Sequence, residues 1–181
     1  SKNLDLNPRK KYNVQFIEEN HQKDDLDYND KFLTYYGIKR FKTFLNEVSN
    51  LVDENSYVLK KIGVSVKFRD LFVIMPNKVQ KEKKTILMFV RHHGNEGTAN
   101  WVFEGFLKSY LRNPILLENY QLIVYPMINP DGVVDNTRFN ANKRDLNRQW
   151  IKKVDEVKIV SDHFDSLGIN LKNIPILLDM H

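Results

Sequence analysis

The chain has no cysteine among its 181 residues. Disulfide bonds, thiolate nucleophiles and thiolate metal ligands are therefore excluded, and any metal ion must be bound by histidine and carboxylate side chains. Long apolar runs are missing too, since the longest, such as Ile86–Val90, are far too short to cross a bilayer. The chain also does not open with the cationic and apolar pattern of a signal peptide. We expect no membrane segment.

The composition is that of a folded globular chain. Hydrophobic residues make up 41% and aromatic residues 12%, and this many large apolar side chains argues against intrinsic disorder. The net charge is +5, and the most basic stretch, residues 138–153, carries six cations and one anion. This stretch matches no recognised nucleic-acid motif and could equally hold a small carboxylate. No nucleic-acid partner is expected.

Hydrophobic periodicity divides the chain into helices and strands. Residues 1–30 are polar and are expected to form an extended arm or the end of a preceding segment. Beyond them we expect helices at 38–52, 97–111 and 151–167, and strands at 58–66, 70–74, 86–90, 120–127 and 174–180. Strands that alternate with helices predict an α/β fold with a mixed, largely parallel sheet sandwiched between helices. The last strand is apolar on both faces, which predicts an interior position in the sheet.

Candidate metal ligands follow two of the predicted strands. His93 and Glu96 form an H-x-x-E pair where the strand 86–90 ends, and His181 ends the strand 174–180. Two histidines and a glutamate are a ligand set suited to a catalytic zinc with one position open for water. The pair alone is weak evidence, because H-x-x-E also occurs by chance. Asp145 and Asp179 offer carboxylates that could orient the ligand imidazoles.

A third group of polar residues lies between these two strand ends. It consists of the turn Asn129-Pro130-Asp131-Gly132, then Arg138, then the run Asp145-Leu146-Asn147-Arg148-Gln149-Trp150. Two guanidinium groups and an amide are suited to gripping a carboxylate. Each part has an ordinary explanation as a surface turn or a surface arginine, but the ordered combination is uncommon.

This ordered set of motifs resembles the zinc carboxypeptidases of the carboxypeptidase A superfamily, and within it the cytosolic-carboxypeptidase branch. Gly94-Asn95 stands where that branch typically has Pro-Gly. The resemblance implies a metallocarboxypeptidase with one Zn²⁺ that cleaves the C-terminal peptide bond of peptides or proteins by a zinc-activated water. At matching positions it implies His93, Glu96 and His181 as zinc ligands, Arg138 as the catalytic group at the scissile carbonyl, Asn147 and Arg148 as the substrate-carboxylate site, and Asp145 behind His93. His92 is expected only to flank the site, and His163 to be exposed.

The resemblance covers about residues 35–181. The family's general-base glutamate lies downstream of the third zinc ligand, so residues 31–181 are expected to be the amino-terminal portion of a longer catalytic domain, truncated after His181 and inactive alone. Two alternatives remain: a zinc amidohydrolase or deacylase of the same superfamily, and a non-catalytic module that binds zinc or a peptide C-terminus. A cytoplasmic location is favoured, with a secreted or periplasmic one left open if a signal peptide was removed.

Overall fold

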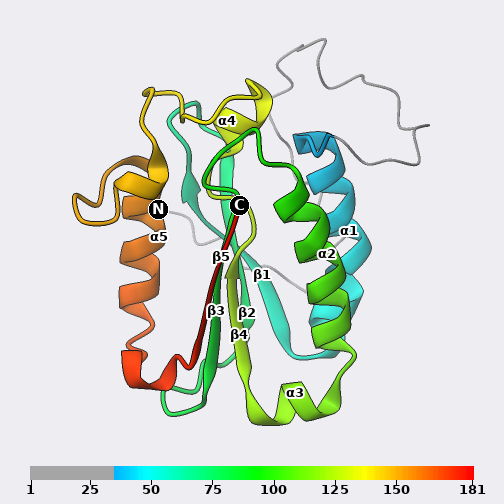
Figure 1. The fold of residues 1–181 in the computed structure, drawn as a ribbon. Coiled ribbons are helices and arrows are strands. Elements are labelled where there is room, and N and C mark those ends of the chain that lie inside the picture. Colours follow the sequence, from blue (N-terminus) through cyan, green and yellow to red (C-terminus); the bar gives the residue numbers. More distant parts are fainter. Residues whose placement is uncertain (1–34) are drawn as a thin grey trace.

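The structure is a computed structural model that describes residues 35–181. The arm expected over residues 1–30 lies outside the described residues. Figure 1 shows three layers, in which helices α1 (Ile38–Glu54) and α2 (Thr98–Leu111) cover one face of a central sheet and α5 (Asp155–Ser166) covers the other. This arrangement is the predicted sheet sandwiched between helices.

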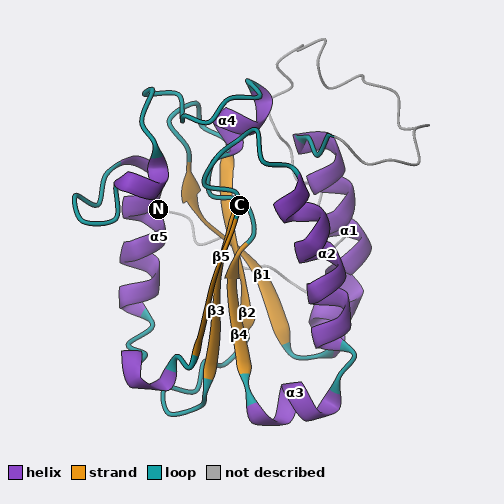
Figure 2. Ribbon diagram, in the orientation of Figure 1, coloured by secondary structure: helices purple, strands orange, loops and turns teal. Residues whose placement is uncertain are grey.

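The central sheet is mixed and has the strand order β1-β2-β4-β3-β5 (Figure 2). β4 and β5 each pair in parallel with β3, whereas β2 runs antiparallel to both β1 and β4. The carboxyl ends of the three parallel strands therefore meet at one edge of the sheet. The strands are β1 (Tyr57–Val64), β2 (Asp70–Pro76), β3 (Thr85–Val90), β4 (Gln121–Tyr125) and β5 (Ile176–Met180).

Alternate side chains of the central strands enter two hydrophobic cores. On β3, Ile86 and Met88 pack in the core under α1 and α2, whereas Leu87 and Phe89 pack in the core under α5. All six residues of β3 are buried, as expected for a parallel strand covered on both faces. This burial fixes the position of the segment that follows β3, which carries His93 and Glu96.

Two local predictions differ from the structure. The helix expected from residue 151 begins at Asp155, and Ile151 is 98% exposed in the preceding loop. The Asn129–Gly132 stretch, expected to be a turn, instead begins the short helix α4 (Pro130–Val134), and another short helix, α3 (Pro114–Asn119), follows the end of α2. Asn113 and Asn129 accept hydrogen bonds from Leu116 N and Gly132 N, and the following proline suits the first helical position.

β5 lies at the edge of the sheet within the described residues. It pairs with β3 alone there, and Ile176 and Leu177 are 37% and 58% exposed. The interior position expected from its apolar pattern is therefore not found in residues 35–181. None of the helices in this range is long and apolar enough to cross a membrane.

Candidate active site and metal centre

The turn after β3 is held by a buried arginine. Arg91 is 1% exposed and has a left-handed backbone with φ 65°. Its guanidinium donates to the carbonyls of Gly94 and Tyr36 and to Asn100 Oδ1, at distances of 2.7 to 3.1 Å. Burial lowers the pKa of Arg91 to about 10. These bonds satisfy backbone acceptors of the turn, so Arg91 determines the path of residues 91–97.

A close backbone approach joins this turn to the next one. A Cβ atom at Gly94 would lie 1.9 Å from the carbonyl carbon of Gly132 and 2.4 Å from Val133 N, so this position requires glycine in this conformation. Asn129 links the same two segments, because its amide donates to His92 O at 3.0 Å while its Oδ1 caps α4. The Asn129–Gly132 motif therefore acts on the geometry of the turn.

His93, Glu96 and His181 converge at the carboxyl ends of β3 and β5. Nδ1 of His93 lies 3.0 Å from both carboxylate oxygens of Glu96, and Nδ1 of His181 lies 2.8 Å from Glu96 Oε2. The two Nδ1 atoms are 3.1 Å apart. β5 brings His181 here because Val90 and Met180 are paired and Arg91 N donates to Met180 O.

The outer nitrogen of each imidazole has its own carboxylate. His93 Nε2 lies 2.9 Å from Asp145 Oδ1, and His181 Nε2 lies 3.2 Å from Asp179 Oδ2. An imidazole that donates its Nε2–H to a carboxylate presents an unprotonated Nδ1 on its other side. Nδ1 of both rings faces Glu96.

The ionisation of these groups follows from their contacts. Desolvation opposes ionisation of Glu96 and Asp145, but the hydrogen bonds from their imidazole partners, and from Arg138 in the case of Asp145, outweigh it and lower both pKa values. Desolvation likewise opposes the charged form of His181, but the bond to Glu96 and the charge of Asp179 raise its pKa. The cluster is therefore rich in negative charge next to imidazole.

The donor set fits a zinc ion. A tetrahedral zinc with bonds of about 2.1 Å separates neighbouring ligand atoms by roughly 3.3 Å, close to the distances among these three side chains. His93, Glu96 and His181 form one group whose ligand atoms all lie within 4.8 Å of one another. His92, Asp179 and His181 form a second such group, which shares His181 with the first.

The candidate substrate residues line the loop between α4 and α5. Arg138 donates from Nε and Nη2 to Asp145 Oδ2 at 3.1 and 2.8 Å, so Asp145 joins this arginine to His93. Asn147 Nδ2 lies 3.1 Å from His181 Nε2. Arg148 is exposed, and within residues 35–181 its guanidinium has a single, long bond of 3.4 Å to Asn147 O. Asn147 and Arg148 belong to the one-turn helix η1 (Leu146–Arg148), which Asp145 caps.

Comparison with known protein families matches residues 44–167 to a family described as zinc carboxypeptidase. The chain belongs to the zinc carboxypeptidase family. The match includes the turn after β3 and the loop that contains Arg138 and Asp145, and His181 lies beyond it.

Individual relatives agree with this family. Among curated proteins, the chain is 36% identical over 88 residues to human cytosolic carboxypeptidase 2, which is 44% of this chain and 10% of that protein. It is 40% identical over 70 residues to mouse cytosolic carboxypeptidase 1, 36% of this chain and 6% of that protein. The chain therefore spans about a tenth or less of the length of these two relatives.

Solved structures of the family share the fold. The metallo-carboxypeptidase from Burkholderia cenocepacia superposes with a TM-score of 0.67 at 26% identity, over 80% of this chain and 40% of that chain. The Pseudomonas aeruginosa metallo-carboxypeptidase, solved with (2-guanidinoethylmercapto)succinic acid, gives 0.65 at 25% identity, over 80% and 39%. The described sheet and helices thus correspond to less than half of either carboxypeptidase.

Sequence reasoning missed the contacts that three residues make beside this candidate site. His92 was expected only to flank the cluster, but it is fully buried and its Nδ1 lies 2.8 Å from Asp179 Oδ1. Trp150 donates to His92 Nε2 at 3.1 Å. Arg91 gave no signal beyond being a charged residue at the end of an apolar run. His163, expected to be exposed, is partly buried on α5 and bonds the hydroxyl of Tyr125, and burial lowers its pKa to about 4.

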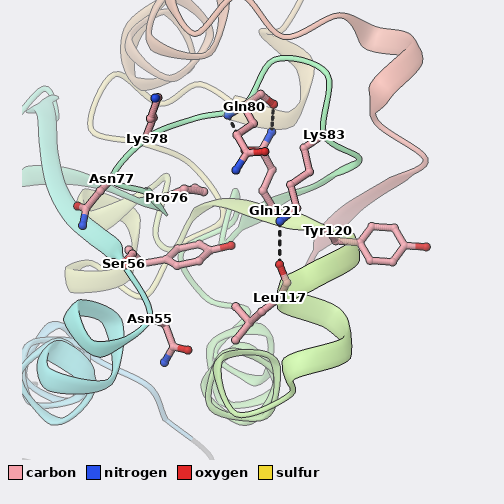
Figure 3. A pocket seen from close by; sticks show the side chains of 11 residues that line it. Asn55, Ser56, Pro76, Asn77, Lys78, Gln80, Lys83, Leu117, Tyr120 and Gln121 are labelled. Atoms are coloured by element: carbon pink, nitrogen blue, oxygen red, sulfur yellow. Dashed lines mark hydrogen bonds between the residues drawn. The ribbon is translucent and has the colours of Figure 1, made fainter.

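A pocket of about 280 Å³ lies away from this site (Figure 3). It is lined by the start of β1 and β4 and by the end of β2, so it sits at the opposite edge of the sheet from His93. Gln121 crosses its wall, accepting from Gln80 N and donating to Gln80 O at 3.1 and 2.7 Å, and Lys83 donates to Leu117 O. These bonds join the loop before β3 to α3 and to the start of β4.

Proposed function

We propose that this protein is a zinc metallocarboxypeptidase that hydrolyses the C-terminal peptide bond of peptides or proteins. One observation carries the proposal: Nδ1 of His93, Nδ1 of His181 and the carboxylate of Glu96 lie within 2.8 to 3.1 Å of one another at the carboxyl edge of the sheet. Membership of the zinc carboxypeptidase family supports it.

His93, Glu96 and His181 would hold one zinc ion in this site. A zinc ion bound by two histidines and a carboxylate lowers the pKa of a coordinated water to about 7, which supplies a nucleophile at neutral pH. Asp145 is placed to keep Nε2 of His93 protonated, so that its Nδ1 stays available for the metal, and Asp179 lies beside Nε2 of His181. These two aspartates and Glu96 already bond imidazoles, and we assign none of them as the general base.

Arg138 and Arg148 have different surroundings and different proposed roles. Arg138 is held by Asp145 next to the metal ligands, which suits a donor directed at the oxyanion that develops on the scissile carbonyl. Arg148 is exposed beside Asn147 and is free to pair with the terminal carboxylate of a peptide. Gripping that carboxylate limits attack to the last peptide bond.

The test measures bound zinc and then kinetics in the complete protein. His93→Ala should remove most of the zinc, whereas His163→Ala, a histidine on α5 outside the cluster, should leave one zinc per chain. Stoichiometric zinc in His93→Ala would refute the metal site. Zinc binding without peptide turnover would favour a binding module, and turnover of N-acyl amino acids in place of peptides would favour a deacylase.

Kinetics separate the two arginines. Arg138→Ala should lower kcat by about 100- to 1,000-fold with little change in KM, because an oxyanion donor acts on the transition state. Arg148→Ala should chiefly raise KM, because the carboxylate is bound in the ground state and the transition state alike. Equal losses of kcat alone would show that the roles are wrongly assigned. Zinc content must be measured in each variant, because Arg138 also contacts His93 through Asp145.

We also propose a cytoplasmic location, because the curated relatives named above are cytosolic carboxypeptidases. Fractionation of cells that express the tagged, complete protein tests this location. Recovery in the secreted or periplasmic fraction would contradict it.

A further inference from the structure

His92 is a buried histidine beside the metal cluster that the proposed reaction does not use. Its side chain is 0% exposed and packs near Phe89 and Trp150, with ring centroids 6.2 and 5.5 Å away. Its ring also stacks on that of His181, with centroids 5.7 Å apart and planes 18° apart. The ring of His92 is therefore fixed by its neighbours and lies directly against a candidate zinc ligand.

Trp150 determines which nitrogen of His92 carries the proton. The indole Nε1–H of Trp150 donates to His92 Nε2 at 3.1 Å. An indole nitrogen is a donor only, so Nε2 must accept this bond, and a neutral imidazole then carries its proton on Nδ1. Nδ1 of His92 is consequently a hydrogen-bond donor.

Asp179 lies between the rings of His92 and His181. His92 Nδ1 lies at an ion-pair distance of 2.8 Å from Asp179 Oδ1, but the contact lacks the angle of a well-formed hydrogen bond. The second oxygen of Asp179 lies 3.2 Å from His181 Nε2. One carboxylate thus bridges a fully buried ring and a ring whose side chain is 32% exposed.

We propose that His92 is a positioning residue of the metal centre, which orients His181 through Asp179 and is itself oriented by Trp150. The inference rests on the proposed zinc site, because His181 is one of its ligands. Within the described residues β5 pairs with β3 alone, so the side-chain contacts of His181 add to that pairing in fixing its position.

The same contacts argue against a second metal ion bound by His92, Asp179 and His181. His181 directs Nδ1 at Glu96, so a further metal on Nε2 would require an imidazolate that bridges two ions. A neutral imidazole with its Nε2–H on Asp179 needs no such ionisation. One zinc per chain is therefore expected, and two zinc ions per chain would overturn the proposal.

Zinc dissociation constants measured by chelator competition test the proposal in the complete protein. His92→Phe keeps an aromatic ring but removes the donor, and it should weaken zinc binding by about 10- to 100-fold. His92→Asn places an amide N–H near the position of Nδ1 and should restore affinity to within about threefold of the original protein. The metal-free forms of both variants should melt at similar temperatures. An unchanged zinc affinity in His92→Phe, or His92→Asn no better than His92→Phe, would overturn the proposal.

A double-mutant cycle distinguishes positioning from a general packing defect. Asp179→Asn should weaken zinc binding, and His92→Phe should then add little, because both changes break one chain of contacts. Fully additive losses would show that His92 does not act through Asp179. If His92→Phe does not fold, Trp150→Phe replaces it in the cycle, since it removes only the indole donor. The two proposals fail in different ways. If the unsubstituted protein binds no zinc, or if His93→Ala binds zinc as tightly as the unsubstituted protein, the metal site itself is refuted. If zinc affinity depends on His93 but not on His92, only this inference is refuted.

Discussion

β3 and β5 are neighbouring parallel strands that each lead to a histidine of the candidate metal cluster, and within the described residues they differ in burial. Leu87 on β3 and Leu177 on β5 are paired across the two strands, and they are 3% and 58% exposed. β3 is buried in full, whereas β5 has partly exposed and exposed residues along its length. The same residue type in register therefore has two different environments.

The segments after the two strands differ in the same way. Buried bonds from Arg91 and the close approach of Gly94 to Gly132 fix the turn that carries His93 and Glu96. His181 is instead oriented by side chains, chiefly Asp179 and Asn147. The cluster therefore combines a turn fixed by buried bonds, residues 91–97, with a histidine, His181, that is oriented by side chains. Metal binding should order the segment at His181 more than the turn.

The largest expected effect compares the paired leucines. Leu87→Ala should destabilise the protein by about 2–5 kcal/mol, because it leaves a cavity in the core under α5. Leu177→Ala should cost less than about 1 kcal/mol, because its side chain already meets water. Chemical denaturation of the two variants measures both values. Similar losses at the two positions would show that β5 is covered in the working protein.

A smaller effect concerns the turn after β3. Gly94→Ala should cost about 1–3 kcal/mol, because its Cβ would overlap the backbone of Gly132. Gly105→Ala is the matched control: no atom lies within 4 Å of a Cβ there, and alanine in the middle of α2 should stabilise the protein by roughly 0.5–1 kcal/mol. Melting curves of both variants test the pair, and a neutral Gly94→Ala would mean that the two turns separate easily.

The smallest effect is expected on removal of the metal. Chelation should raise hydrogen exchange at residues 179–181 by about threefold to tenfold, while exchange at residues 91–97 should change less, since Arg91 holds that turn without the metal. Exchange followed by mass spectrometry with and without chelator measures the two segments together. Equal changes in both segments would contradict the conclusion that residues 91–97 are held more rigidly than residues 179–181.

Much of this fold was predictable because its signals are local. The apolar stripe of α1, the continuous apolar run of β3 and the helix over 97–111 follow from side-chain periodicity, and the mixed sheet follows from the alternation of strands and helices. The family resemblance was likewise carried by short motifs, and the family match over residues 44–167 confirms it.

Predictions from the sequence failed where the environment of a residue in the fold differed from the one that its hydrophobic pattern indicated. Ile151 fits the apolar stripe of a helix, but the chain makes a loop there and α5 begins only at Asp155. His163 was expected to be exposed, but it packs against Tyr125 of β4. The interior position predicted for β5 needs a second neighbouring strand, which residues 35–181 do not supply, so it stays a prediction.

The sequence by itself determined the kinds of groups available to this site. With no cysteine, only imidazoles and carboxylates could bind a metal, and the order of the motifs identified the family. Only the tertiary structure decided that Nδ1 of both histidines faces Glu96 and that His92 reaches Asp179. The physical reason is that the contacts of His181 with Glu96 and of His92 with Asp179 join residues more than 80 positions apart, and they exist because β3 and β5 pair in one register at one edge of a sheet.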